Sequence, residues 1–325
     1  MLVFSALVLL LASVSQPAFG QSSVKETSAI AADKSPSPRT DSGAPDLQGV
    51  WDYRTMTPLE RPRDFAGKET LTPEEAAAYE QQQNALLADY DRAPSVHAKW
   101  WLDYGTALTE DKRTSLLIDP PDGRLPAVTD DAKRRSAARS EERRRHPADA
   151  AENRGLTERC LTFGMPRLPG AYNNNFQILQ TPTHVAIISE MIHDARIIPL
   201  DSRPFLSSEV SQWHGNSRGR YEGDTLVVET RNFSEKSAFR GSTPALHLIE
   251  RFTRVNPETA YYEFTVSDPS TWASDWTALV PMKKTAQAIY EYACHEGNHG
   301  LRNILHNARF EEDQNYTDKL PKPQK

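Results

Sequence analysis

The second half of the chain is a series of short apolar or alternating segments separated by turn residues, and this pattern limits the choice of folds more than any other feature. Turns are supplied by Thr181-Pro182-Thr183, Glu222-Gly223-Asp224 and Asn256-Pro257-Glu258. The strands are expected at Phe176 to Gln180, His184 to Met191, Ala195 to Leu200, Asp224 to Thr230, Leu246 to Val255, Ala260 to Ser267, Trp276 to Val280 and Ala286 to Ala293. No helical pattern that could carry a parallel crossover lies between them. A mainly β fold is therefore predicted over residues 159–310, an antiparallel sheet closed or nearly closed into a barrel.

The first ordered strand is expected at Asp46 to Trp51, and it contains a Gly49-x-Trp51 pair. In lipocalin-like barrels such a pair places a large ring across the closed end, where an arginine from late in the chain stacks on it. Arg302 or Arg309 is the predicted partner. The sequence thus favours a lipocalin-like β-barrel or a strongly curved sheet, with peripheral N-terminal helices.

The N-terminus has the pattern of an export signal. An apolar run from Val3 to Leu11 is too short to span a bilayer, and Ala18-Phe19-Gly20 before Gln21 has the form of a signal-peptidase site. The absence of a basic residue ahead of the apolar run is a departure from that pattern. We expect a signal peptide at 1–20, a disordered linker at 21–45 and no membrane span, so that the protein is periplasmic or secreted.

Two helices are predicted between the first strand and the barrel, in an N-terminal region at 46–158 that packs on it. Thr72-Pro73-Glu74-Glu75 is a capping box that begins a helix ending near Tyr90. The arginine-rich segment from Asp130 to Arg145 has helix propensity but almost no apolar stripe. It is either an anion or polysaccharide patch or a solvated connector. Residues 311–325 are expected to be a disordered tail.

Composition excludes several classes of function. A formal net charge of -6 gives no basic footprint for nucleic acid. The chain lacks a Gly-x-Ser-x-Gly elbow, a phosphate-binding glycine loop, a dinucleotide fingerprint and a Cys-x-x-Cys pair, so no nucleotide cofactor is expected. A divalent metal is left open.

The chain has two cysteines, Cys160 and Cys294. In an oxidising compartment two cysteines are most simply a disulfide. The alternative is a thiol ligand or nucleophile beside His295.

Cys294 is followed by a literal His-Glu-x-x-His string formed by His295, Glu296 and His299. On a helix, His295 and His299 would share a face and bind zinc, with Glu296 as general base. Gly297 and Asn298 are poor helix formers, which favours a strand end running into a polar turn.

Ionisable residues also gather in the apolar hairpin EMIHDARIIPL, which contains Glu190. Charged groups in a half-buried sheet require partners or face a cavity. We expect this hairpin and the turn after Cys294 to meet at one rim of the barrel. The predicted catalytic residues are His193, Asp194, Arg196, His295 and Glu296.

Further polar and aromatic residues are candidates for ligand binding. The amides of Asn173, Asn174 and Asn175 bind a sugar or hold a loop. Trp213 and His214 lie in a segment, 213–219, that is predicted to be a flexible loop at the barrel mouth. Trp272 and Trp276 either join Trp213 in an aromatic platform or anchor the core. Arg251 and Glu263 are predicted to be a cross-strand pair, and Glu291 points inward.

The strings YNNNFQ, EMIHDARIIP, GRYEGDTLVVET and YEYACHEGN, together with ERCL followed by GMPR, resemble a family of uncharacterised secreted bacterial proteins. The resemblance covers nearly all of the chain after the signal and implies no activity. Its relatives often carry an aromatic residue at the position of His299, which argues against a metal ligand there.

Two functions remain. In the first, the barrel is an enzyme that acts on a small or saccharide-like molecule by His/carboxylate acid-base chemistry, in an elimination, isomerisation or hydrolysis. In the second, it is an extracytoplasmic binding protein for an apolar or aromatic ligand. A wet pocket lined by histidine and carboxylates would support the enzyme, and a dry aliphatic pocket the binding protein.

Overall fold

A ten-stranded antiparallel sheet dominates the computed structural model, which describes residues 38–89 and 102–319. All of these residues belong to one compact unit, Asp33–Lys325. The predicted signal peptide and most of the predicted linker lie outside the described residues. The strands are β1 (Gly49–Asp52), β2 (Leu117–Asp119), β3 (Asn175–Gln180), β4 (His184–Ser189), β5 (Ala195–Pro199), β6 (Asn216–Glu222), β7 (Thr225–Arg231), β8 (His247–Asn256), β9 (Thr259–Ser267) and β10 (Trp276–Thr285).

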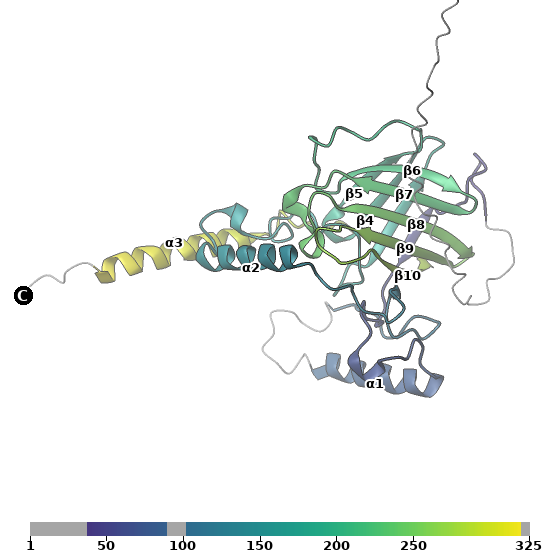
Figure 1. Cartoon of the computed structure of the whole chain (residues 1–325), viewed down its shortest axis with the longest axis horizontal. Helices are drawn as coiled ribbons and strands as arrows, with labels where there is room; N and C mark the ends of the chain where they lie inside the picture. Colours follow the sequence, from purple (N-terminus) through teal and green to yellow (C-terminus); the bar gives the residue numbers. More distant parts are fainter. Residues whose placement is uncertain (1–37, 90–101, 320–325) are drawn as a thin grey trace, which may run out of the picture. The chain divides into compact units, whose positions relative to one another are not determined.

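The strand order is β5-β4-β3-β1-β10-β9-β8-β7-β6, with β2 added beside β10. Figure 1 shows β6 to β10 as successive neighbours in the sheet. Alternation along the strands builds the core, because every second residue of β8 and β9 is buried on the same face. Aromatic rings fill that core: Phe176 lies 5.6 Å from Tyr262, and Phe252 stacks on Tyr262 at 4.9 Å between ring centroids. The mainly β, nearly closed barrel is confirmed.

The two ends of the strand order, β5 and β6, lie beside each other without pairing. Gly219 makes their close approach possible, since a Cβ there would lie 2.8 Å from Cγ2 of Ile198 and 3.0 Å from Cδ2 of Leu200. The barrel is therefore closed by packing rather than by hydrogen bonds along this line. We call the line between β5 and β6 the seam.

The Gly49-x-Trp51 pair lies where the sequence predicts it, but its cationic partner is a different residue. Trp51 is fully buried, and its indole Nε1 donates to the Leu47 carbonyl at 2.7 Å. The guanidinium on its ring is that of Arg254 in β8, 5.6 Å from the centroid. The prediction of Arg302 or Arg309 was wrong, because both residues belong to the C-terminal helix.

Within the described residues three α-helices accompany the sheet: α1 (Pro73–Asp89), α2 (Asp130–Arg145) and α3 (His299–Lys319). The capping box of α1 is present, since Thr72 N donates to Glu75 Oε2 at 2.9 Å and Glu75 N donates to Thr72 Oγ1 at 3.3 Å. Short 3-10 helices occur at η1 (Arg63–Phe65), η4 (Ala151–Asn153), η5 (Met191–His193), η6 (Glu235–Ser237) and η7 (Phe239–Gly241). Within the described ranges no helix is both long and apolar enough to cross a membrane.

Four predicted segments differ from the structure. The expected strand at 286–293 is absent, because β1 and β9 pair with β10 only as far as Thr285. Residues 216–219, predicted as loop, are part of β6. The predicted tail begins with helix, since α3 continues to Lys319. Order starts before Asp46, where Arg39 and Pro45 form a β-bridge.

A buried ion pair lies inside the barrel among the aromatic rings. Arg196 of β5 donates through Nη1 to Glu250 Oε2 at 2.6 Å and through Nη2 to Oε1 at 3.0 Å. The Tyr262 hydroxyl donates to the same Oε1 at 2.8 Å. Burial alone would lower the pKa of Arg196, but the Glu250 carboxylate outweighs it and raises that pKa. The pair links β5 to β8 across the barrel interior.

We predict that Arg196→Met lowers the free energy of unfolding by about 3–5 kcal/mol, because it leaves the Glu250 carboxylate buried without its charge partner. Denaturant unfolding measures the loss. The double variant Arg196→Met with Glu250→Leu should recover most of it. The control is Arg220→Met, which removes an exposed ion pair with Glu222 and should change the free energy of unfolding by about 1 kcal/mol or less. A double variant less stable than Arg196→Met would contradict this account.

Candidate functional site

A second buried ion pair connects the β4–β5 hairpin to the loop before β3. Arg167 Nη2 donates to Asp194 Oδ2 at 2.6 Å and to the Met191 carbonyl at 3.1 Å. The side chains of Arg167 and Asp194 are only 2% and 8% exposed. The backbone N of Arg167 donates to the Tyr262 hydroxyl at 3.3 Å, so this pair joins the Arg196-Glu250 pair in one network.

The network extends from Asp194 to His214 through the hydroxyl of Thr162. Thr162 Oγ1 donates to Asp194 Oδ2 at 3.0 Å and accepts from Gly164 N at 2.8 Å. His214 Nε2 lies 2.6 Å from the same hydroxyl and 3.3 Å from Asp194 Oδ2. A hydroxyl has one hydrogen and two lone pairs. Since its hydrogen is given to the carboxylate, it accepts from His214 Nε2, and the proton of the neutral ring is therefore on Nε2.

This tautomer leaves Nδ1 of His214 as the basic atom of the ring. Nδ1 has no hydrogen-bond partner among the described residues. An imidazole held at one nitrogen by a hydroxyl and a carboxylate and free at the other can act as a general base.

The carboxylate behind His214 is held ionised by its neighbours. Burial alone would raise the pKa of Asp194, but the hydrogen bond and charge of His214, the charge of Arg167 and the Phe163 N-H outweigh it and lower that pKa. Burial lowers the pKa of Arg167, against the charges of Tyr53 and Asp194.

The backbone that presents Asp194 adopts an unfavourable conformation. Ile192 and His193 have φ angles of 58° and 45°, in the left-handed region that a β-branched residue avoids. Ser189 N donates to the Asp194 carbonyl at 2.7 Å, and the Arg167 guanidinium holds the Met191 carbonyl, so the turn is fixed from both sides. Such strain is concentrated at functional sites.

His214 lines a cavity of about 920 Å³ that follows the seam. Its walls are formed by β5, by the start of β6 and by the long connection between them. The lining residues are His184, Ala195, Arg196, Ile197, Pro199, Arg203, Leu206, Ser211, Gln212, Trp213, His214, Gly215, Asn216, Ser217, Arg218, Ser234 and Lys236. We call this space the seam cavity.

A tight turn at Gly215 places Trp213 and His214 in the cavity wall. Gly215 has a φ of 66°, and a Cβ there would lie 2.6 Å from the Arg231 carbonyl oxygen. Only glycine fits both conditions. The turn is closed by Gly215 N donating to the Gln212 carbonyl at 3.2 Å.

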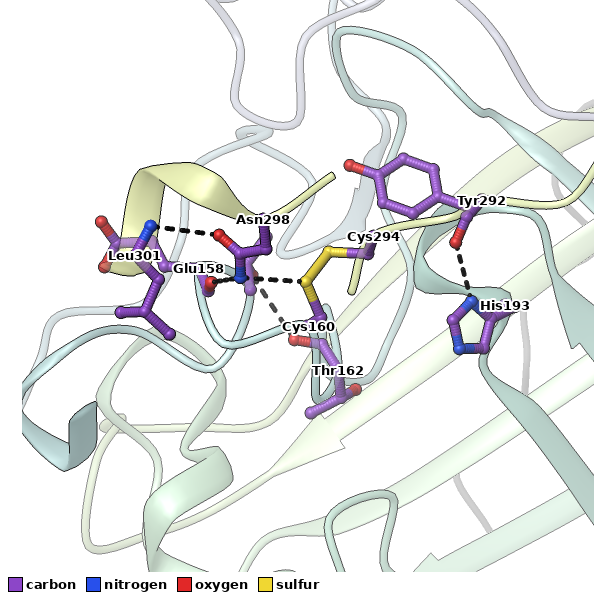
Figure 2. Close-up of a disulfide and its surroundings, with 9 residues drawn as sticks. Glu158, Cys160, Thr162, His193, Tyr292, Cys294, Asn298 and Leu301 are labelled. Carbon is purple, nitrogen blue, oxygen red and sulfur yellow. Dashed lines mark hydrogen bonds between the residues drawn. A yellow bond between two sulfur atoms is a disulfide. The ribbon is translucent and has the colours of Figure 1, made fainter. Parts of the chain in front are cut away.

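The disulfide predicted from the sequence is present between Cys160 and Cys294. Figure 2 shows the disulfide together with two hydrogen bonds made by residues on either side of Cys294. Asn298 Nδ2 donates to the Glu158 carbonyl at 2.7 Å, and His193 Nδ1 lies 2.9 Å from the Tyr292 carbonyl. The disulfide therefore joins the loop that carries Thr162 to a segment that rests on the β4–β5 hairpin.

The structure brings the β4–β5 hairpin into contact with the segment just before Cys294, through His193 and the Tyr292 carbonyl, but the predicted catalytic side chains lie in different environments. His193, His295 and Glu296 are exposed to solvent, whereas Asp194 and Arg196 are buried in the ion-pair network. Of the five predicted residues, Arg196 lines the seam cavity and Asp194 contacts a residue that does.

The zinc-binding interpretation of His295 and His299 finds no support in the geometry. Residues 294–297 form turns, and α3 begins only at His299, so the two histidines do not share a helical face. In the described part of the chain no group of three His, Cys, Asp or Glu side chains is arranged to hold a metal ion.

The asparagine run has the loop-holding role. Asn174 is buried, accepts from Gly170 N at 2.7 Å and donates to the Asp103 carbonyl at 3.0 Å. Asn175 donates to Glu190 at 2.7 Å, and Asn173 occupies a left-handed turn.

Of the three tryptophans considered for a platform, only Trp213 lines a cavity, while Trp272 and Trp276 are core residues. Arg251 and Glu263 face each other across β8 and β9, as predicted. Both side chains lie on the face of the sheet away from the core, because they alternate with the core-facing residues of β8 and β9. Glu291 is exposed, which contradicts its inward assignment.

Sequence reasoning missed Thr162, Arg167 and Glu250. For Glu250 the sequence contains a signal of a buried charge, because this carboxylate lies at a core position of the alternating strand, between Leu248 and Phe252. Arg167 is the last residue of the GMPR string, and its buried partner, Asp194, lies in the distant β4–β5 hairpin. A partner 27 residues away in the chain is set by the fold and not by spacing.

Comparisons with protein-family models, curated proteins and solved structures find no match for this chain. The function is therefore argued from the site alone.

We predict a loss of the Asp194 contribution to stability in acid. A carboxyl whose folded pKa is lowered stabilises the fold above its unfolded pKa of about 3.9, and this contribution disappears as the pH falls through the lower folded value. Asp194→Asn should therefore cost most near pH 7 and less below about pH 4. Urea titrations at a series of pH values measure the difference, with exposed Asp275→Asn as control. A cost that is independent of pH would contradict the assignment.

Proposed function

We propose that the protein is an enzyme that acts on a small polar or saccharide-like molecule by acid-base chemistry, with His214 as the proton-transfer group. The observation that carries the proposal is the fixed imidazole in the wall of the seam cavity. His214 Nε2 is engaged by Thr162 and Asp194, and the ring lines about 920 Å³ of space. A cavity of this size accommodates a small-molecule substrate.

In this mechanism His214 Nδ1 takes a proton from the bound substrate. The imidazolium that forms is stabilised by the Asp194 carboxylate, which Arg167 keeps ionised inside the protein. Thr162 and Asp194 are positioning residues, because they hold the ring in the tautomer with Nδ1 free. General base catalysis of this kind contributes roughly 10²–10⁴-fold in rate. Elimination and isomerisation begin with such a transfer from the substrate, whereas in hydrolysis the same nitrogen takes the proton of the attacking water.

The chemistry of the cavity wall favours the enzyme over a binding protein for an apolar ligand. Imidazole, guanidinium, amide and hydroxyl side chains outnumber the apolar side chains, which are those of Ala195, Ile197, Pro199, Leu206 and Trp213. A site that binds by desolvation alone would be lined predominantly by hydrophobic residues. The carboxylate of the proposed site belongs to Asp194, which does not line the cavity itself but contacts His214, which does.

The proposal includes an exported location, periplasmic or secreted. The Cys160–Cys294 disulfide supports it, because disulfides persist in oxidising compartments. The apolar leader with a small-x-small site before Gln21 is the second supporting observation.

The test compares two histidines with the same substitution. Turnover is first located by screening the protein against mono- and oligosaccharides and their derivatives, and kcat/KM is then measured for each variant. We expect His214→Asn to lose about 100-fold or more in kcat/KM. His193→Asn, which changes an exposed ring outside the cavity, should stay near the wild-type value. Thr162→Val should lower kcat more than it raises KM and should shift the pH profile, as expected for a positioning residue.

Two outcomes would contradict the proposal. One is a His214→Asn protein that retains wild-type turnover. The other is an absence of turnover together with tight binding of apolar or aromatic ligands in the cavity, which would support the binding-protein interpretation.

A further inference from the structure

We infer that the seam cavity takes a cyclic molecule that carries a carboxylate, a sugar acid, with the carboxylate against Lys236 and Arg218 and the ring against Trp213. The inference rests on the site of the proposed function and names its substrate class. It is drawn from the charges of the cavity wall, which differ in sign from the charge of the protein.

The wall of the seam cavity contains six cationic or imidazole side chains and no Asp or Glu: His184, Arg196, Arg203, His214, Arg218 and Lys236. The protein as a whole has a formal net charge of -6. Acidic residues are thus in excess elsewhere and missing from this wall. Basic clefts in an acidic protein select anions.

Three of these six side chains have a carboxylate partner outside the wall. Arg196 is paired with Glu250, Arg203 with Asp201, and His214 with Asp194. Their charges are balanced within the protein. They add hydrogen-bond donors to the cavity without adding a surplus of positive charge.

Arg218 and Lys236 have no carboxylate partner in the described residues. Arg218 donates through Nε and Nη2 to the Pro204 carbonyl at 3.1 and 2.5 Å and through Nη1 to the Ser217 carbonyl at 2.7 Å. Backbone carbonyls orient the guanidinium but leave its charge uncompensated. Burial and the nearby charge of Arg203 lower the pKa of Arg218, against the charge of Asp201, which raises it. Lys236 is exposed on η6 at the same wall.

The remaining polar wall suits hydroxyl groups. Ser211, Gln212, Asn216 and Ser234 supply amides and hydroxyls that both donate and accept. Trp213, the one aromatic side chain of the wall, offers a flat face for a ring. An inorganic anion would contact the two cations but would not engage the amides, the hydroxyls or the Trp213 ring. A sugar acid uses all three kinds of group.

The experiment measures binding by isothermal titration calorimetry in matched pairs of sugars. Galacturonate and glucuronate are compared with galactose and glucose, which have the same rings without the carboxylate. We expect the uronates to bind at least tenfold more tightly, which corresponds to about 1.4 kcal/mol, and the advantage to shrink as salt is raised.

Variants then separate the parts of the site. Lys236→Met should weaken uronate binding about tenfold and leave neutral sugars unaffected. Arg218→Met should act in the same direction, but it also releases the carbonyls of the β5–β6 connection, so Lys236→Met carries the test. Trp213→Ala should weaken both uronates and neutral sugars. The matched control is the double variant Arg139→Met with Arg144→Met, which removes two positive charges from α2, outside the cavity wall, and should change nothing.

Three results would overturn the inference: equal affinity for a uronate and its neutral sugar, unchanged uronate binding in Lys236→Met, or inorganic phosphate competing as strongly as the uronate. Failure of the proposed function is separable from these. Uronate binding without any turnover would refute the enzyme and leave the inference standing. Turnover of a neutral sugar that depends on His214 would refute the inference and leave the enzyme standing.

Discussion

The contact between Arg167 and Asp194 is the interaction on which the rest of the site depends. Two charges are withdrawn from water at 2.6 Å, at a desolvation cost that only good geometry and further hydrogen bonds offset. Those further bonds define the site: Thr162 and His214 approach the same carboxylate oxygen, and the Arg167 guanidinium also holds the strained β4–β5 turn at Met191. Together with the Thr162 hydroxyl and the Ser189 N-H, the ion pair holds the His214 ring and the left-handed turn in place.

The site also depends on the barrel, which provides a place where a polar side chain is accessible to solvent while the apolar core stays buried. Because β5 and β6 approach without pairing, the wall between them is interrupted, and the connection that joins them carries Trp213 and His214 into it. The Arg196-Glu250 pair holds β5 to β8 behind that wall. The Cys160–Cys294 disulfide fixes the loop of Thr162 from outside (Figure 2).

The sequence predicts the architecture better than the site, for a physical reason. Strand alternation and turn residues are local, so β3, β4, β5, β7, β8, β9 and β10 are identified, as are the α1 capping box and the disulfide. The segment at 286–293 looks like a strand but has no neighbour left to pair with, which only the topology decides. Asp194 and Arg196 are recognised as ionisable groups among isoleucines. Their partners Arg167 and Glu250 come from distant elements, and His214 is classed with ligand-binding residues because its link to Asp194 exists only in the fold.

The most direct test of this account is the position of the proton on His214. Long-range proton-nitrogen NMR correlation of the protein labelled with ¹⁵N-histidine distinguishes the two ring nitrogens, and His214→Asn assigns the signals. The account predicts that neutral His214 carries its proton on Nε2, toward Thr162 and Asp194, with a bare Nδ1. A neutral ring protonated on Nδ1 would contradict it, because the basic nitrogen would then face the ion pair and no proton acceptor would be available to the cavity.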